Sequence, residues 1–205
     1  MSTAYNTVIF DLGNVLINWN PQHLYRKIFD DEQEMNYFLN EVCTGAWNKE
    51  QDRGRPFAEA VQQKTAEFPQ YALQIRSYHE RWSEMLDGPI EENVRVLEDL
   101  RAKPGIRLYA LTNWSTETFP VAQQRFPFLR YFEDTVVSGE LKLVKPDAAI
   151  YRVLLDRHAI VPEQAIFIDD TLENVAGAEA LGIHGIHFTP DTDLRKELEG
   201  LGVLP

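Results

Sequence analysis

The sequence predicts an α/β protein in which a parallel sheet carries one inserted block of helices. Two observations support this prediction: strand-like and helix-like patterns alternate over residues 91–205, and residues 18–88 show helical patterns without a convincing strand. The length of 205 residues suits one large domain or a domain with an insertion. We therefore predict a discontinuous core, residues 1–17 and 89–205, and a helical cap, residues 18–88.

The predicted strands are short apolar runs that stop at polar turn formers. The first, residues 5–10, ends in Val8-Ile9-Phe10 and meets Asp11. Such runs, which lack polar alternation, are typical of strands that are covered on both faces, as in parallel sheets. Similar runs occur at residues 106–111, 135–137, 165–168 and 185–188.

The predicted helices of the core lie between these runs. Residues 91–103 place Val94, Leu97 and Leu100 on one face, and a Pro-Gly pair then ends the helix. The insertion at residues 18–88, about 70 residues long, exceeds the length of ordinary loops. Further core helices are predicted at residues 147–158, 172–181 and 194–201.

The charge balance excludes several classes of partner. There are 32 acidic and 20 basic residues, a net charge of −12, so the surface repels nucleic-acid backbones and anionic membranes. No apolar run approaches the roughly 18 residues of a membrane span. Residues 1–7 lack the features of a signal peptide, so we expect a cytoplasmic protein. We also expect a monomer or a small homo-oligomer. The single cysteine, Cys43, excludes an intramolecular disulfide.

Polar residues gather at the predicted ends of several strands, where open parallel sheets bind ligands. Each cluster alone has an ordinary explanation as a turn or a helix cap. Together they form a chemical set: a carboxylate can attack phosphorus, carboxylates suit Mg²⁺, and a hydroxyl, an amide and a lysine can hold phosphoryl oxygens. The clusters are Asp11-Leu12-Gly13-Asn14, Thr112-Asn113, Lys145-Pro146-Asp147 and Asp169-Asp170.

The order and spacing of these clusters resemble the haloacid dehalogenase-like (HAD) hydrolase superfamily. The resemblance covers residues 7–16 and about 90–188, and all four family motifs occur in family order. A single match would be a weak signal, but four matches in order, each at the end of a predicted strand, are specific. The motifs are VIFDLGNVL, LYALTN, LKLVKPDAAIY and AIFIDDTLENVAGAEALGI.

The resemblance implies a Rossmann-like core, a helical cap that closes over the site, and roles for the motif residues. Asp11 would be the catalytic nucleophile, Thr112 and Asn113 would bind phosphate, and Lys145 would steady both nucleophile and phosphate. The cofactor would be Mg²⁺, and the substrate a small phosphorylated metabolite. The metal ligands would be Asp11, the backbone carbonyl of Gly13 and Asp170, with Asp169 as an alternative ligand or a residue just behind the ligands.

Gly13 departs from the family pattern, because most phosphatases of the superfamily have an acid there that protonates the leaving group. Three readings follow. The chain hydrolyses substrates with an easily released group, such as sugar 1-phosphates, as the Asp-Leu-Gly-Asn-Val similarity to bacterial α-D-glucose-1-phosphate phosphatases suggests. Alternatively it is a metal-independent 2-haloacid dehalogenase that uses the same aspartate. Alternatively it is a catalytically weak binding or regulatory protein.

Two cap residues are candidates for substrate contacts. Arg53 lies in an Asp-Arg-Gly-Arg segment that the glycine marks as a loop, and Trp47 is nearby. A loop of the cap usually reaches the site in this family, so Arg53 could contact phosphate or hydroxyl groups. The competing interpretations are a solvated turn for Arg53 and core packing for Trp47.

Overall fold

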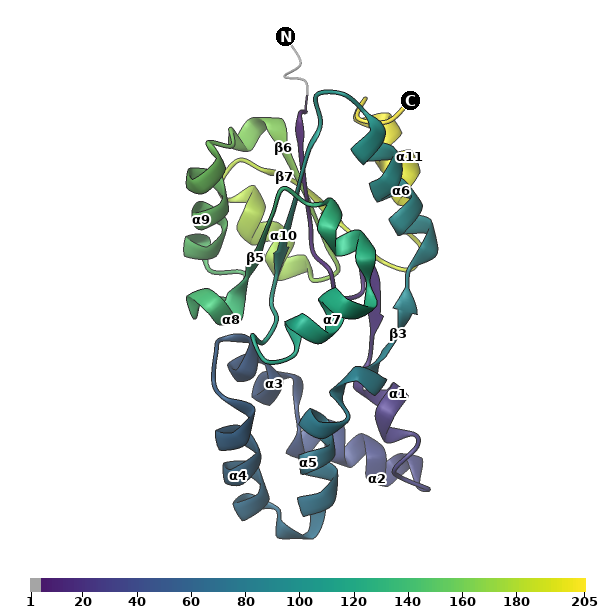
Figure 1. Cartoon of the computed structure of the whole chain (residues 1–205), viewed down its shortest axis with the longest axis vertical. Coiled ribbons are helices and arrows are strands. Elements are labelled where there is room, and N and C mark those ends of the chain that lie inside the picture. Colours follow the sequence, from purple (N-terminus) through teal and green to yellow (C-terminus); the bar gives the residue numbers. More distant parts are fainter. Residues whose placement is uncertain (1–4) are drawn as a thin grey trace.

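The computed structural model describes residues 5–205 and contains a five-stranded parallel sheet (Figure 1). The strand order is β5-β4-β1-β6-β7, with β1 (Thr7–Phe10) at the centre. β4 (Arg107–Thr112) and β6 (Ala165–Asp169) flank it, and β5 (Asp134–Val137) and β7 (His184–His187) form the edges. The predicted α/β class and all five predicted core strands are confirmed, within about two residues at each end.

Helices cover both faces of the sheet, and successive side chains of each strand pack alternately on one face and on the other. In β1, Val8 and Phe10 belong to one hydrophobic cluster and Ile9 to another. The Ile9 cluster is completed by α9 (Ala148–His158) and α10 (Leu172–Glu179). Helices α6 (Glu91–Ala102) and α11 (Leu194–Gly200) cover the opposite face, as Figure 1 shows. Two shorter helices of the core are α7 (Phe119–Arg125) and α8 (Ser138–Leu141).

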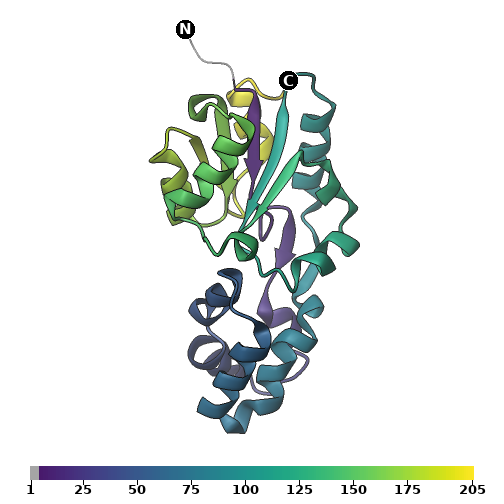
Figure 2. The same ribbon diagram turned by 60° about the vertical axis from the view of Figure 1, so that its left-hand side comes forward.

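The inserted block forms a helical cap at the end of the molecule opposite the start of β1 and the C-terminus (Figures 1 and 2). Its α-helices are α1 (Pro21–Tyr25), α2 (Glu32–Tyr37), α3 (Gly45–Asp52), α4 (Phe57–Glu67) and α5 (Ala72–Glu80). A π-helical turn, Phe38–Val42, extends α2. Short 3₁₀ turns occur in the cap at Pro69–Tyr71 and Trp82–Met85, and in the core at Pro127–Tyr131 and Pro162–Gln164.

The cap joins the core through a two-stranded antiparallel ribbon that the sequence did not reveal. β2 (Ile17–Trp19) pairs with β3 (Leu86–Pro89). The expectation that residues 18–88 hold no strand is therefore wrong at both ends. The ribbon is too short to show a strand pattern, and the Asp-Gly-Pro within β3 is typical of a turn. It spans both predicted domain boundaries, so the boundaries stay a prediction, and residues 1–4 of the predicted core lie outside the described residues.

The topology puts the end of β1 next to the cap. The cap is inserted directly after β1, and the parallel strands β4 and β6 end at the same edge of the sheet as β1. This edge is the place where open α/β sheets bind ligands. Among residues 5–205, no helix is both long and apolar enough to cross a membrane.

Candidate active site

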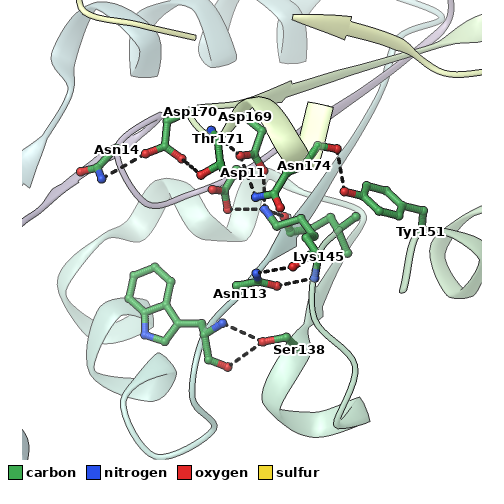
Figure 3. Close-up of polar contacts among 12 residues, drawn as sticks. Asp11, Asn14, Asn113, Ser138, Lys145, Tyr151, Asp169, Asp170, Thr171 and Asn174 are labelled. Atoms are coloured by element: carbon green, nitrogen blue, oxygen red, sulfur yellow. Dashed lines mark hydrogen bonds and ion pairs between the residues drawn. The ribbon is translucent and has the colours of Figure 1, made fainter. Parts of the chain in front are cut away.

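Residues of all four predicted clusters converge at the carboxyl edge of the sheet, although Lys145 lies in the loop between α8 and α9 and not at the end of a strand as predicted. Asp11 directly follows β1, and its backbone N–H donates to the carbonyl of Ile168 at 2.8 Å, which continues the ladder with β6. Thr112 is the buried last residue of β4. Asp169 ends β6, and Asp170 comes next. Figure 3 shows the Asp11, Asp169 and Lys145 side chains pointing toward one another.

Lys145 is the positive centre of the site and is fully buried. Its Nζ donates to Asp169 Oδ2 at 2.6 Å and to the carbonyl of Leu111 at 2.8 Å, and it lies 2.9 Å from Asp11 Oδ1. Burial lowers the pKa of the ammonium group, but the charges of Asp11 and Asp169 outweigh this, and the net shift is upward. Lys145 therefore stays protonated and balances two carboxylates.

Two amide side chains hold this ion pair in place. Asn113 accepts from the Lys145 backbone N–H at 2.8 Å and donates to the Lys145 carbonyl at 3.2 Å, so it pairs with the loop as a strand would. The Asn174 side chain donates to Asp169 Oδ1 at 2.9 Å, and the backbone carbonyl of Asn174 accepts from the Tyr151 hydroxyl at 2.7 Å. The positions of Lys145 and Asp169 are thus fixed by contacts within the protein, as Figure 3 shows.

Asn14 connects the site to the cap. Its backbone has a left-handed φ of 54°, which asparagine tolerates better than most residues. The side chain donates to Asp170 Oδ2 at 3.2 Å and accepts from the backbone N–H of Trp19 at 3.2 Å. Because Trp19 ends β2, the Asn14 side chain connects the Asp170 carboxylate to the ribbon of β2 and β3.

Burial and the neighbouring negative charges raise the pKa values of Asp11 and Asp170. Burial raises the pKa of Asp11 from 3.8 to about 7, Lys145 opposes this, and the charges of Asp169 and Asp170 add to it. The pKa of Asp170 is also raised, first by burial and then by the charge of Asp169. The site therefore holds more negative charge than its single ammonium group can neutralise.

This charge excess fits a divalent cation. Asp11, Asp169 and Asp170 each offer an oxygen, and these atoms lie within 4.8 Å of one another. Asp11 Oδ1 is buried and accepts no hydrogen bond, so the Lys145 ammonium group at 2.9 Å contacts it as an ion pair. Three carboxylates against one ammonium leave two negative charges uncompensated, and Mg²⁺ prefers such oxygen donors. A contribution from the carbonyl of Gly13 stays a prediction.

A cavity lies between the carboxyl edge of the sheet and the cap. Its walls combine aromatic side chains with a few polar ones, and its volume is about 80 Å³. Gly13 and Asn113 contribute from the core, so the cavity adjoins the nucleophile loop and the Lys145 loop. The full lining is Gly13, Trp19, Asn48, Asp52, Phe57, Trp82, Asn113, Trp114 and Thr118.

Among the cap residues that line the cavity, Asp52 is the one with a carboxyl group, and it was not among the residues predicted from the sequence. Arg53, the predicted contact, has a side chain that is 45% exposed and lies 3.8 Å from Glu50. Trp47 packs edge-on against Tyr78 inside the cap, with 4.9 Å between ring centroids. Neither lines the cavity, so a substrate contact by Arg53 or Trp47 stays a prediction. The sequence feature that could have indicated Asp52 is its position directly before the Arg53-Gly54 loop.

Comparisons with known proteins agree with this architecture. The chain is 25% identical over 202 residues to a sesquiterpene phosphatase from Aspergillus oryzae, with 98% of each chain covered. It is 24% identical over 203 residues to a phosphorylated carbohydrates phosphatase from Thermotoga maritima, covering 88% of this chain and 83% of that one.

A HAD family enzyme from Bacteroides thetaiotaomicron has the same fold, with a TM-score of 0.75 at 22% identity. The likeness covers 95% of this chain and 99% of that chain, and the enzyme was crystallised as a mutant with magnesium and inorganic phosphate. The pattern of one hydrolase family, the haloacid dehalogenase-like hydrolases, matches residues 5–182 of the present chain. With this match added to the strand-end cluster and the cap, the chain belongs to the haloacid dehalogenase-like hydrolase family.

Proposed function

We propose that the protein is a Mg²⁺-dependent phosphatase that acts on a small phosphorylated metabolite, a sugar 1-phosphate being the substrate class we favour. The observation that carries this proposal is the cluster of Asp11, Asp169, Asp170 and Lys145 beside the cavity. Asp11 is placed to attack phosphorus and form an aspartyl-phosphate. Bound Mg²⁺ would neutralise charge on the phosphoryl group and the carboxylates.

The side chains divide the remaining work. Lys145 holds Asp11 and Asp169 in fixed positions and keeps a positive charge near the attacking oxygen. Asn113, which lines the cavity, and Thr112, the last residue of the neighbouring strand, would bind the phosphoryl oxygens. Asn14 fixes the orientation of Asp170. These contacts are formed in the ligand-free protein, so little reorganisation is needed at the moment of reaction.

The cavity supports a sugar as the leaving group. Trp19, Trp82 and Trp114 offer flat apolar faces, and Asn48 and Thr118 offer groups that can bond to hydroxyls. An anomeric hydroxyl is also more acidic than an ordinary alcohol, so its release makes a smaller demand on a proton donor.

The test is a phosphate-release screen over sugar phosphates and acyl phosphates, with Mg²⁺ and with EDTA. We expect Mg²⁺-dependent release that Asp11→Asn abolishes, because an amide cannot form the aspartyl-phosphate. Full activity in Asp11→Asn would refute the proposal. EDTA-insensitive release of halide from 2-haloacids would instead establish the dehalogenase alternative. Absence of turnover with even acyl phosphates would establish the binding or regulatory alternative.

A further inference from the structure

Among the described residues 5–205, the core side of the site offers no free proton donor for the leaving group. Position 13, next to the nucleophile loop, is a glycine, and Lys145 is engaged by Asp11, Asp169 and a backbone carbonyl. Among the residues that line the cavity in the described chain, Asp52 is the one with a titratable side chain. It comes from the cap, not from the core.

We propose that Asp52 is the general acid and general base of the reaction, supplied by the cap in place of the side chain that Gly13 lacks. This inference rests on the proposed phosphatase function. Asp52 is the last residue of α3 and is half-buried, as expected of a group in a cavity wall. Its Oδ2 accepts from Asn48 Nδ2 at 3.1 Å, which fixes the side chain within the cap.

The backbone around Asp52 is docked on the core. Ser138 Oγ, at the end of β5, donates to the Asp52 carbonyl at 2.5 Å. Two residues later, Gly54 has a φ of 100°, and a Cβ there would lie 3.0 Å from the Gly139 carbonyl oxygen. The loop and the core therefore meet backbone to backbone.

A second anchor lies at the start of α4. The backbone N–H of Phe57 donates to Glu117 Oε1 at 2.8 Å. Glu117 belongs to the loop that follows β4, so this contact also joins the cap to the catalytic edge of the core. The segment that carries Asp52 is thus fixed to the core on both sides of the Asp-Arg-Gly loop, which leaves the carboxyl group at a defined position in the cavity.

The environment of Asp52 keeps the carboxyl group protonated near neutral pH. Burial raises its pKa from 3.8 to about 8, and the charge of Asp11 is the next largest cause. The backbone N–H of Ser115 and the charges of Lys49 and Lys145 oppose this shift. An acid in this state can donate a proton to a leaving oxygen, and the resulting carboxylate can then accept one from water.

Asp52 alone can carry out the proton transfers of both half-reactions. In the first, an Asp11 carboxylate oxygen bonds to phosphorus, the bond from phosphorus to the leaving oxygen breaks, and that oxygen takes the proton of Asp52. In the second, water attacks the phosphorus of the aspartyl-phosphate and gives a proton to Asp52. The bond between phosphorus and the Asp11 oxygen then breaks, which releases phosphate and restores both aspartates.

A pair of substrates of similar size but different leaving groups tests this role. The alkoxide of benzyl phosphate needs a proton as it leaves, whereas the 4-nitrophenolate of 4-nitrophenyl phosphate needs little. The measurement is the rate of alcohol release in the first turnover, with Mg²⁺ present. For Asp52→Asn we expect a loss of about 10²–10⁴-fold with benzyl phosphate and less than about threefold with 4-nitrophenyl phosphate. We also expect the phosphoenzyme to accumulate, because the base of the second step is missing.

Glu50→Gln is the matched control, because it makes the same chemical change on an exposed position of the same helix. It should leave both rates unchanged. Equal losses on the two substrates in Asp52→Asn, or no loss on either, would overturn the role of Asp52, while abolition of both rates by Asp11→Asn would still uphold the phosphatase. Release of neither alcohol by the unaltered protein, together with no phosphate release in the screen of sugar phosphates and acyl phosphates, would overturn the phosphatase and this inference with it.

Discussion

Replacing Lys145 by methionine should destabilise the protein strongly and in a way that depends on Mg²⁺. The side chain is fully buried, and methionine preserves much of its length while removing the charge. Nζ now faces Asp169 at 2.6 Å and Asp11 at 2.9 Å. The variant would leave both carboxylates in a buried site without a counter-ion.

The magnitude follows from the cost of an unpaired buried charge. Removing one partner of a buried ion pair costs about 3–5 kcal/mol. The carboxylates can reduce this cost by binding a proton, and Asp11 already has a pKa of about 7 with Lys145 present. Loss of the ammonium group raises that pKa further. We therefore expect the full loss at about pH 8 and a smaller one at about pH 5, where Asp11 is protonated even in the unaltered protein.

The assay is urea unfolding followed by tryptophan fluorescence, with and without Mg²⁺. Saturating Mg²⁺ should return a substantial part of the lost stability to Lys145→Met, because a ligand at about 100 times its Kd contributes about 2.7 kcal/mol. Lys196→Met, at an exposed lysine of α11, is the control and should change the free energy of unfolding by less than about 0.5 kcal/mol. A loss below about 1 kcal/mol in Lys145→Met at pH 8 would refute the reasoning.

Two further predictions concern the proton donor and the metal. In an Asp52→Asn background, Gly13→Asp should raise the first-turnover rate on benzyl phosphate at least about tenfold, because a Cβ at Gly13 meets no atom within 4 Å; an unchanged rate would contradict this. The affinity of the protein for Mg²⁺, measured by titration calorimetry, should weaken by about tenfold per pH unit below about 7, because Asp11 must lose its proton to bind the ion. An affinity independent of pH over this range would show that Asp11 is not a ligand.

The core of the fold could be predicted because its signals are local. Runs such as Val8-Ile9-Phe10 are apolar throughout, and each ends at a polar residue that has no place inside a sheet. The parallel topology then brings Asp11, Thr112 and Asp169 to one edge without further information. Lys145 could be selected from the sequence as a candidate, but its contact with Asp169 could not be predicted from a local pattern, since Lys145 lies in a loop and the contact spans 24 residues.

The cap side of the site could not be predicted, because it depends on long-range docking. Asp52 reaches the cavity through contacts with Ser138 and the core loop after β4, and no local pattern encodes those contacts. Arg53 was the more attractive candidate from sequence because a cation suits phosphate. The end of α3 instead leaves Arg53 largely in solvent beside Glu50. The ribbon of β2 and β3 escaped notice for a similar reason, since its pairing joins segments about 70 residues apart.

The contact between Gly54 of the cap and Gly139 of the core determines which kinetic step discriminates between substrates. Gly54 packs so closely against the Gly139 carbonyl that no side chain fits between them, and Asp52 lies two residues before Gly54. A phosphorylated compound too bulky for the closed cavity would still find the core carboxylates and Lys145, but it would hold the proton donor away from the leaving oxygen. Oversized compounds would then occupy the site without turning over, so the enzyme would discriminate through kcat, and rejected compounds would behave as inhibitors.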